Sequence, residues 1–222
     1  MSSRDAILAN IRRSLGVTGW EPPRRFEVEA RLSAAPLGVV PQRGQGDVAS
    51  RSAIFKAEAE RAQATVAEVG SLAEVPTEAA RYLRGNNCPA TLRMGADSRL
   101  AGMPWGETAL EITHGRSDGH DLNAISFAFA AIAETGTLAM VSGPDNPTTL
   151  NFLPDNQIVV VARDEIEADY ESVFAKLRRI YGKGAAPRTL NFITGPSRSA
   201  DIEQTLLLGA HGPRRLHVVI VG

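Results

Sequence analysis

The segment Gln157-Ile158-Val159-Val160-Val161 is apolar after its first residue and rich in β-branched side chains. A strand without a polar face predicts burial on both sides, as in the parallel sheets of α/β proteins. Residues 137–141 and 216–221 have the same character. Helical patterns alternate with these strands along the chain. The alternation predicts a three-layer, mostly parallel open sheet flanked by helices.

The other elements follow from the spacing of apolar residues. Apolar positions recur at helical spacing in four segments, and short apolar runs indicate further strands. Helices are expected at residues 3–15, 47–69, 75–83 and 169–180, and strands at 89–94, 109–113, 189–193 and the start of 124–133.

Residues 17–46 contain four prolines and several glycines, which predicts an extended connector. We therefore expect an N-terminal helix and a Pro/Gly-rich connector over residues 1–46. An α/β domain is expected over residues 47–222. A chain of 222 residues is long enough for one such domain with a helical appendage.

Charge and cysteine content exclude several classes of function. The formal net charge of −1 argues against a nucleic-acid or membrane-surface binder, since both usually need a positive field. Cys88 is the only cysteine, so this chain by itself cannot hold an iron–sulfur cluster or a Cys-ligated zinc. The amino terminus lacks the apolar core of a signal peptide, and no apolar run reaches membrane-spanning length. We expect a cytoplasmic protein without a membrane span, and the residues identify no cofactor.

Three polar loops, at residues 133–137, 194–203 and 209–213, each follow an apolar run. Open α/β sheets bind ligands at the carboxyl ends of their strands, so these loops are expected to form one cleft. Residues 142–147 leave another strand and are expected to form a wall of the same cleft.

The second loop reads Thr194-Gly195-Pro196-Ser197-Arg198-Ser199-Ala200-Asp201-Ile202-Glu203, and its end predicts the start of a helix that continues through Leu207. A strand that turns into a helix at this point offers free backbone N–H groups to an anion.

The side chains of this loop indicate the kind of anion. Ser197 and Ser199 supply hydroxyl donors beside Gly195, and Arg198 can clamp a carboxylate or phosphate. Acidic residues in the predicted first helical turn already offset the positive end of the helix dipole, which favours a singly charged carboxylate. The alternative is a well-capped helix with no ligand.

Glu134 lies in the first loop, with the hydroxyls of Thr135 and Thr137 beside it and Gly136 allowing close approach of a ligand. A carboxylate at a strand end can serve as a nucleophile toward an acyl group, as a general base, or as a cation ligand. The structural alternative is that Glu134 caps backbone N–H groups or pairs with an arginine.

His211 stands in the third loop, Gly-Ala-His-Gly-Pro, before the last strand. Its imidazole either belongs to the site or fixes the turn by a hydrogen bond to a carbonyl. No second ligand accompanies it in the sequence, so no metal site is expected.

Together, residues 132–137, Leu153-Pro154, residues 193–203 and residues 209–213 resemble the lactate utilisation protein C family. The motifs occur in the family's order, and the resemblance extends over most of residues 47–222. It implies a fold like that of glucosamine-6-phosphate deaminase, ribose-5-phosphate isomerase and the CoA transferases.

The resemblance further implies a bacterial protein that acts in the oxidation of L-lactate to pyruvate, beside iron–sulfur partner proteins. In this interpretation Arg198 holds a small carboxylate, Glu134 orients or deprotonates it, and His211 shapes the pocket or relays a proton. The alternative is an independent acyl-transfer, CoA-transferase-like or ligase-like enzyme with Glu134 as its nucleophile. A phosphosugar isomerase is disfavoured by the acidic residues after Arg198.

Overall fold

The computed structural model describes residues 2–200, 206–209 and 211–222, and it divides into two compact units, Met1–Val39 and Val40–Gly222. The first unit contains helices α1 (Ser3–Leu15) and α2 (Pro22–Ala34), and neither helix contains a buried residue. The predicted division between residues 46 and 47 stays a prediction.

Helix α2 corrects the expectation of an extended connector over residues 17–46. Pro22 and Pro23 occupy the first turn of the helix, where a missing N–H costs no intrahelical hydrogen bond. Arginine, glutamate and alanine, which are good helix formers, dominate the next turns. Ala35 ends the helix in the left-handed conformation, with φ 42°. Prolines here therefore mark the start of a helix as well as extended chain.

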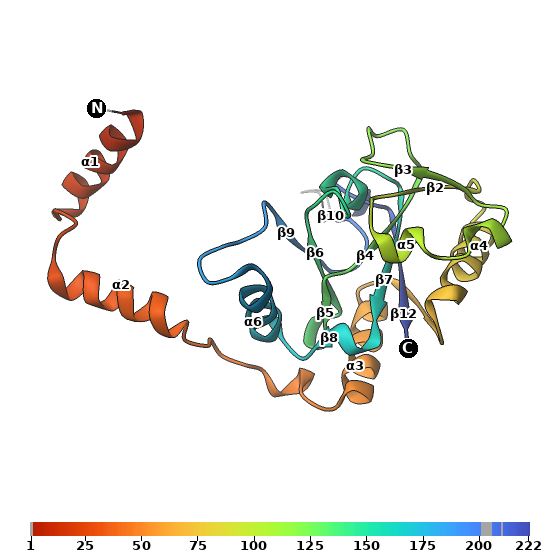
Figure 1. The fold of residues 1–222 in the computed structure, drawn as a ribbon, viewed down its shortest axis with the longest axis horizontal. Helices are drawn as coiled ribbons and strands as arrows, with labels where there is room; N and C mark the ends of the chain where they lie inside the picture. The colour runs from red at the N-terminus through yellow and green to blue at the C-terminus, as the bar shows by residue number, and fades with distance from the viewer. Residues whose placement is uncertain (1, 201–205, 210) are drawn as a thin grey trace. The chain divides into compact units, whose positions relative to one another are not determined.

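The centre of the second unit is a sheet in which every pairing of neighbouring strands is parallel. The predicted mostly parallel sheet flanked by helices is thereby confirmed (Figure 1). Residues Ile158 to Val161 are fully buried, because β4 and β12 pair with β7 on either side and both faces are covered. In order across the sheet, the strands are β1 (Thr65–Val69), β12 (Arg215–Val221), β7 (Asn156–Ala162), β4 (Asn123–Phe127), β2 (Thr91–Met94) and β3 (Glu111–His114).

A second sheet, which the sequence did not predict as a separate layer, packs on the central one. Its residues Leu138 and Met140 share a core cluster with Val159 and Val218 of the central sheet. The predicted strand over residues 137–141 forms, but it belongs to this second sheet and runs antiparallel to both neighbours. In order, the strands are β8 (Ile166–Glu167), β5 (Ala130–Ile132), β6 (Thr137–Val141) and β9 (Leu190–Ile193).

Helices cover the outer faces of both sheets (Figure 1). Helix α4 (Val75–Gly85) and the short α5 (Ser98–Ala101) pack on one face of the central sheet. Helix α3 (Val48–Arg61) shares the other face with the second sheet, and α6 (Tyr170–Tyr181) covers the far face of that sheet. Burial of these apolar faces provides the main favourable free energy of folding.

The predicted helix over residues 47–69 is wrong in its last third. Helix α3 ends at Arg61, and the chain then turns through Gln63, which has φ 72°. The residues that follow form β1, whose β-branched Thr65, Val66 and Val69 favour an extended chain.

The helix predicted to continue through Leu207 is also wrong. Leu206 and Leu207 lie in β11 (Leu206–Leu208), which pairs antiparallel with β10 (Arg198–Ala200). Residues 201–205, which carry the acidic positions of the predicted first helical turn, lie outside the described residues. A hairpin satisfies the backbone groups after Pro196 by cross-strand bonds, so the argument from a helix dipole no longer applies.

Candidate functional site

A hollow of about 380 Å³ lies where three segments of the second unit meet. The segments are the end of the 3₁₀ helix η5 (Thr148–Asn151), the turn after β9, and the loop before β12. Its lining combines polar groups with two phenylalanine rings. Prominent lining residues are Asn151, Phe152, Phe192, Thr194, Arg198 and His211.

The hollow does not lie at the carboxyl edge of the central parallel sheet, as the sequence argument expected. Asn151 and Phe152 precede β7, and Gly212 and Pro213 precede β12, so these strands face it with their amino ends. The expectation holds for β9, whose carboxyl end leads directly into the lining at Thr194. The difference arises because β9 belongs to the second sheet.

The turn after β9 is fixed by main-chain and side-chain bonds to the loop before β12. The backbone N–H of Ser197 donates to the carbonyl of Pro213 over 2.8 Å, and Gly209 N–H donates to the carbonyl of Ser197 over 3.1 Å. The Ser197 hydroxyl accepts from the backbone N–H of His211 over 3.3 Å. Ser197 therefore joins the second and third predicted loops.

Arg198 begins β10 with an exposed side chain that lines the hollow. Its Nη2 donates to the carbonyl of Ala62 at the end of α3 over 3.2 Å. A guanidinium carries five N–H donors, so this bond orients the group and occupies only one of them.

Gly195 lines the hollow, and the packing of the turn also requires a glycine at this position. It has φ +67°, and a β-carbon at this position would overlap the carbonyl oxygen of Ala62. The turn therefore sits directly on the end of α3, and only glycine fits there. The same contact places Arg198 beside Ala62.

His211 is exposed and lines the hollow with Arg198. Its backbone N–H, and not its ring, makes the bond that closes the loop onto Ser197. The structure thus brings the predicted guanidinium and imidazole to one solvent-accessible hollow.

Glu134 is not brought to this hollow. It lies in the 3₁₀ helix η4 (Ala133–Thr135), is 4% exposed, and is absent from the hollow's lining. Its backbone N–H donates to the carbonyl of Ala168 over 3.2 Å, and its β-carbon packs against Gly44. Among the described residues its Oε2 has no hydrogen-bond partner. The predicted convergence of carboxylate, guanidinium and imidazole is met by two of the three groups.

Residues 135–137 support the hollow from behind. The Thr137 hydroxyl is fully buried and lies 2.6 Å from that of Thr194, which lines the hollow. Thr135 Oγ1 lies 2.7 Å from Thr137 Oγ1, and Tyr170 Oη lies 3.2 Å from it. Gly136 faces α3, where a β-carbon would overlap the helix backbone. The first predicted loop is therefore linked to the second by a chain of hydroxyls.

Two further expectations concern residues near the hollow. Ser199 lies in β10, where it pairs with Leu207. Residues 142–147, predicted as a wall, do not appear in the lining; η5 immediately after them supplies Asn151 in their place. Asn146 points inward instead and donates to the carbonyl of Val141 over 3.0 Å.

Sequence reasoning missed Asn151, Phe152 and Phe192. Phe152 stands next to the quoted Leu153-Pro154 motif, and Phe192 lies in a strand predicted to be buried, although it is 37% exposed. No sequence signal identified these residues as part of the hollow, because the exposure of Phe192 is known only from the structure.

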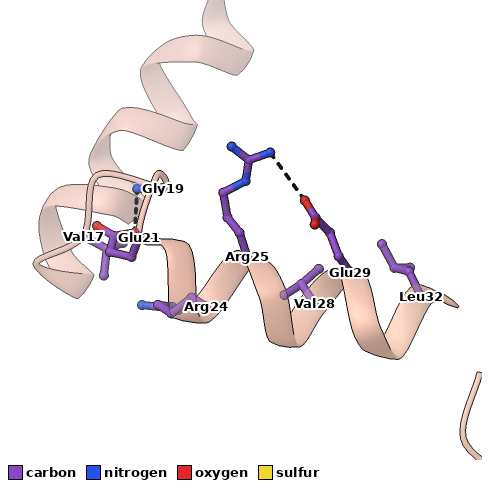
Figure 2. A pocket seen from close by; sticks show the side chains of 8 residues that line it. All are labelled: Val17, Gly19, Glu21, Arg24, Arg25, Val28, Glu29 and Leu32. Carbon is purple, nitrogen blue, oxygen red and sulfur yellow. Dashed lines mark hydrogen bonds and ion pairs between the residues drawn. The ribbon is translucent and has the colours of Figure 1, made fainter. Parts of the chain in front are cut away.

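A second hollow, of about 430 Å³, lies within the first unit (Figure 2). It is formed by α2 and the turn before it. Arg25 Nη2 and Glu29 Oε1 lie 3.4 Å apart along the helix, and Glu21 accepts from the backbone of Gly19 over 3.1 Å. Val28 and Leu32, which also line it, are more than half exposed. We regard it as a groove on an uncovered helix, because every charged group in it has an exposed local partner or faces solvent.

Away from both hollows, a buried histidine joins β1, α4 and β12. His217 is 2% exposed, with Nε2 3.1 Å from Glu78 Oε1 and Nδ1 2.8 Å from Thr65 Oγ1. Its ring stacks on Tyr82, with centroids 4.1 Å apart. Burial lowers the pKa of His217 to about 4, against the opposing effect of the Glu78 carboxylate.

The lowered pKa of His217 should make the stability of the protein depend on pH. Between about pH 6.5 and about pH 4 the unfolded His217 binds a proton and the folded one does not, so acidification through this window lowers the free energy of unfolding. We expect a loss of about 2–3 kcal/mol from this group. His217→Gln should remove that part of the pH dependence in urea unfolding at pH 7 and pH 4.5. Equal pH slopes for variant and wild type would contradict the assignment.

Among residues 2–200, 206–209 and 211–222, no group of three or more His, Cys, Asp or Glu side chains could hold a metal ion. Within the same ranges, no helix has both the length and the apolar character required to cross a bilayer.

Comparison with known proteins gives a consistent result. Residues 122–221 match the LUD domain. Over 98 residues the chain is 38% identical to Lactate utilization protein C of Geobacillus sp. (strain WCH70) and 34% identical to that of Bacillus subtilis (strain 168). Each match covers 44% of this chain and 41% of the relative. The matched segment thus spans about two fifths of the length of these relatives.

A solved structure supports the fold. A DUF162 family protein from Deinococcus radiodurans is similar with a TM-score of 0.57 and 24% identity, over 80% of this chain and 100% of that chain. The predicted resemblance to lactate utilisation protein C is confirmed by the sequence matches, although over a narrower span than residues 47–222.

Proposed function

We propose that this chain, whose residues 122–221 match the LUD domain, is the cluster-free component of a bacterial system that oxidises L-lactate to pyruvate. The relatives named Lactate utilization protein C support this role. The structural observation that carries the proposal is that Arg198 and His211 line one hollow. A guanidinium recognises a carboxylate through parallel N–H bonds, so the hollow suits a small organic acid.

The shape of the lining agrees with a short acid. Arg198 binds the carboxylate, and the rings of Phe152 and Phe192 provide an apolar wall for the carbon end. Oxidation of a 2-hydroxy acid to a 2-oxo acid releases two electrons and two protons. In this proposal both electrons pass to iron–sulfur partner proteins. The His211 imidazole, exposed at the hollow, accepts one proton, and the second proton passes to solvent.

The alternative, acyl transfer through Glu134, lacks support from the geometry. A nucleophile must reach the acyl carbon, whereas Glu134 is 4% exposed and does not line the hollow.

Co-purification tests the proposed role. The tagged chain is isolated from lactate-grown cells of the organism that encodes it, and L-lactate oxidation by the co-purified proteins is assayed with and without this chain. We expect iron–sulfur proteins in the complex and a loss of activity when the chain is omitted. A chain that purifies alone, from cells that grow on lactate without it, would contradict the proposal.

The first unit offers a surface for those partners. Helix α1 exposes Ile7, Ile11 and Leu15 to extents of 59%, 48% and 61% along one stripe. We expect deletion of residues 2–16 to reduce co-purification of partners severely, because this apolar stripe would be lost. The free energy of unfolding should change by less than about 1 kcal/mol, since α1 contains no buried residue. An unchanged pull-down would rule out this role for α1.

A further inference from the structure

A buried amide forms part of the hollow's surface. Asn151 is 1% exposed, and yet it lines the hollow together with Arg198 and His211. It ends η5, immediately before the chain reaches Phe152. A side-chain amide with so little exposure is in a low-dielectric environment, where an unpaired hydrogen-bonding group is costly.

The oxygen of this amide is held by two donors from the central sheet. Ser126 Oγ donates to Asn151 Oδ1 over 3.3 Å, and Gln157 Nε2 donates to the same oxygen over 3.3 Å. Gln157 Nε2 also donates to Ser126 Oγ over 3.2 Å. Ser126 and Gln157 are 1% and 0% exposed, so this arrangement is rigidly packed. Together these bonds fix the orientation of the Asn151 amide.

The nitrogen of the same amide has no partner. Among the described residues, Asn151 Nδ2 is buried and makes no hydrogen bond. A buried donor without an acceptor destabilises the fold, and such groups are few in native proteins. If the Asn151 amide alone exchanged its two ends, its Nδ2 would face the donor Gln157 Nε2. Gln157 Oε1 likewise has no hydrogen-bond partner among the described residues.

We infer that Asn151 is a specificity-determining residue that contacts ligand, its Nδ2 donating to an uncharged oxygen beside the carboxylate of a 2-oxo or 2-hydroxy acid. Gln157 and Ser126 act as positioning residues for it. This inference rests on the proposed function, in which Arg198 binds the carboxylate of the same molecule. The apolar rings of Phe152 and Phe192 then face the remaining carbon atoms.

Titration calorimetry on the purified full chain tests the inference with pyruvate and propionate, which share a carboxylate and three carbons but differ at the 2-oxygen. The wild type should bind pyruvate at least about tenfold more tightly, the effect of one buried hydrogen bond. In Asn151→Ser the ratio of pyruvate affinity to propionate affinity should fall to about one, and the propionate affinity should be unchanged. Asn151→Asp, which keeps the shape but presents a negative charge, should lose pyruvate binding.

Asn156→Ser is the matched control. Asn156 is also buried, at 3% exposure, but it donates to the Leu122 carbonyl and to Asn123 Oδ1 and does not line the hollow. Its pyruvate-to-propionate ratio should equal that of the wild type. Thermal unfolding of each variant checks the fold, and Asn151→Asp decides the matter if Asn151→Ser does not fold.

Three outcomes overturn the inference. The inference about Asn151 is wrong if Asn151→Ser keeps the wild-type ratio of pyruvate to propionate affinity. It is also wrong if the wild type binds both acids equally. If Arg198→Ala still abolishes binding of both acids in that case, the carboxylate site of the proposed function stands. If the wild type binds neither acid, both proposals fail together.

Discussion

Arg198→Ala should abolish binding of small carboxylates and growth on L-lactate, while the free energy of unfolding changes by less than about 1 kcal/mol. The Arg198 side chain is exposed, and so is its hydrogen bond to the Ala62 carbonyl. The variant therefore loses little packing. The ligand, in contrast, loses the cation that pairs with its charge. Complementation of a deletion strain and urea unfolding of the purified variant measure the two effects.

Two further variants sharpen this experiment. Arg198→Lys keeps the positive charge but not the planar donor pair, so we expect weakened and not abolished binding. Arg214→Ala is the matched control, because Arg214 is a 60% exposed arginine on the loop before β12 that does not line the hollow. Wild-type growth of the Arg198→Ala strain would remove Arg198 from the site.

Gly136→Ala should destabilise the second unit by about 2–5 kcal/mol. Gly136 has φ +63°, a conformation that costs a non-glycine residue about 1–2 kcal/mol. In addition, the new β-carbon would overlap the backbone of α3 at Glu58 and Ala59, and overpacking of this kind costs about 1–3 kcal/mol. Because Thr137 bonds to Thr194, the displacement should also reach the hollow.

Gly106→Ala serves as the control for this variant. A β-carbon at Gly106 meets no atom within 4 Å, and this glycine does not have positive φ. Its midpoint in urea should match the wild type. If Gly136→Ala is as stable as the control, α3 can move away from residue 136 at little cost in free energy. The close packing of η4 on α3 would then not be required for stability.

Most strands of the central sheet could be predicted because their sequences are locally consistent, whereas β1 was predicted as the end of a helix. In β7, Ile158 to Val161 are all β-branched and all buried, so local preference and burial agree. The sequence also predicted that the loops at residues 194–198 and 211–213 come together, and both line the same hollow.

Other features depend on contacts that a sequence pattern does not contain. Nothing local distinguishes β6, which pairs antiparallel in the second sheet, from a strand of the central sheet, because both are apolar on both faces. Leu206 and Leu207 suit a helix or a strand equally, and pairing with β10 decides between them. The burial of Glu134 follows from its contacts with Gly44 and Ala168, residues far from it in sequence.

The central claim is that the hollow beside Arg198 binds a small carboxylate. Mapping of backbone amide shifts by NMR tests this claim most directly. On addition of pyruvate to the isotope-labelled chain, we predict saturable shifts at Ser197, Arg198 and Gly212, with none at Glu134. The same titration of Arg198→Ala should leave these amides unshifted. Saturable shifts centred on Glu134, or identical shifts in wild type and Arg198→Ala, would contradict the account.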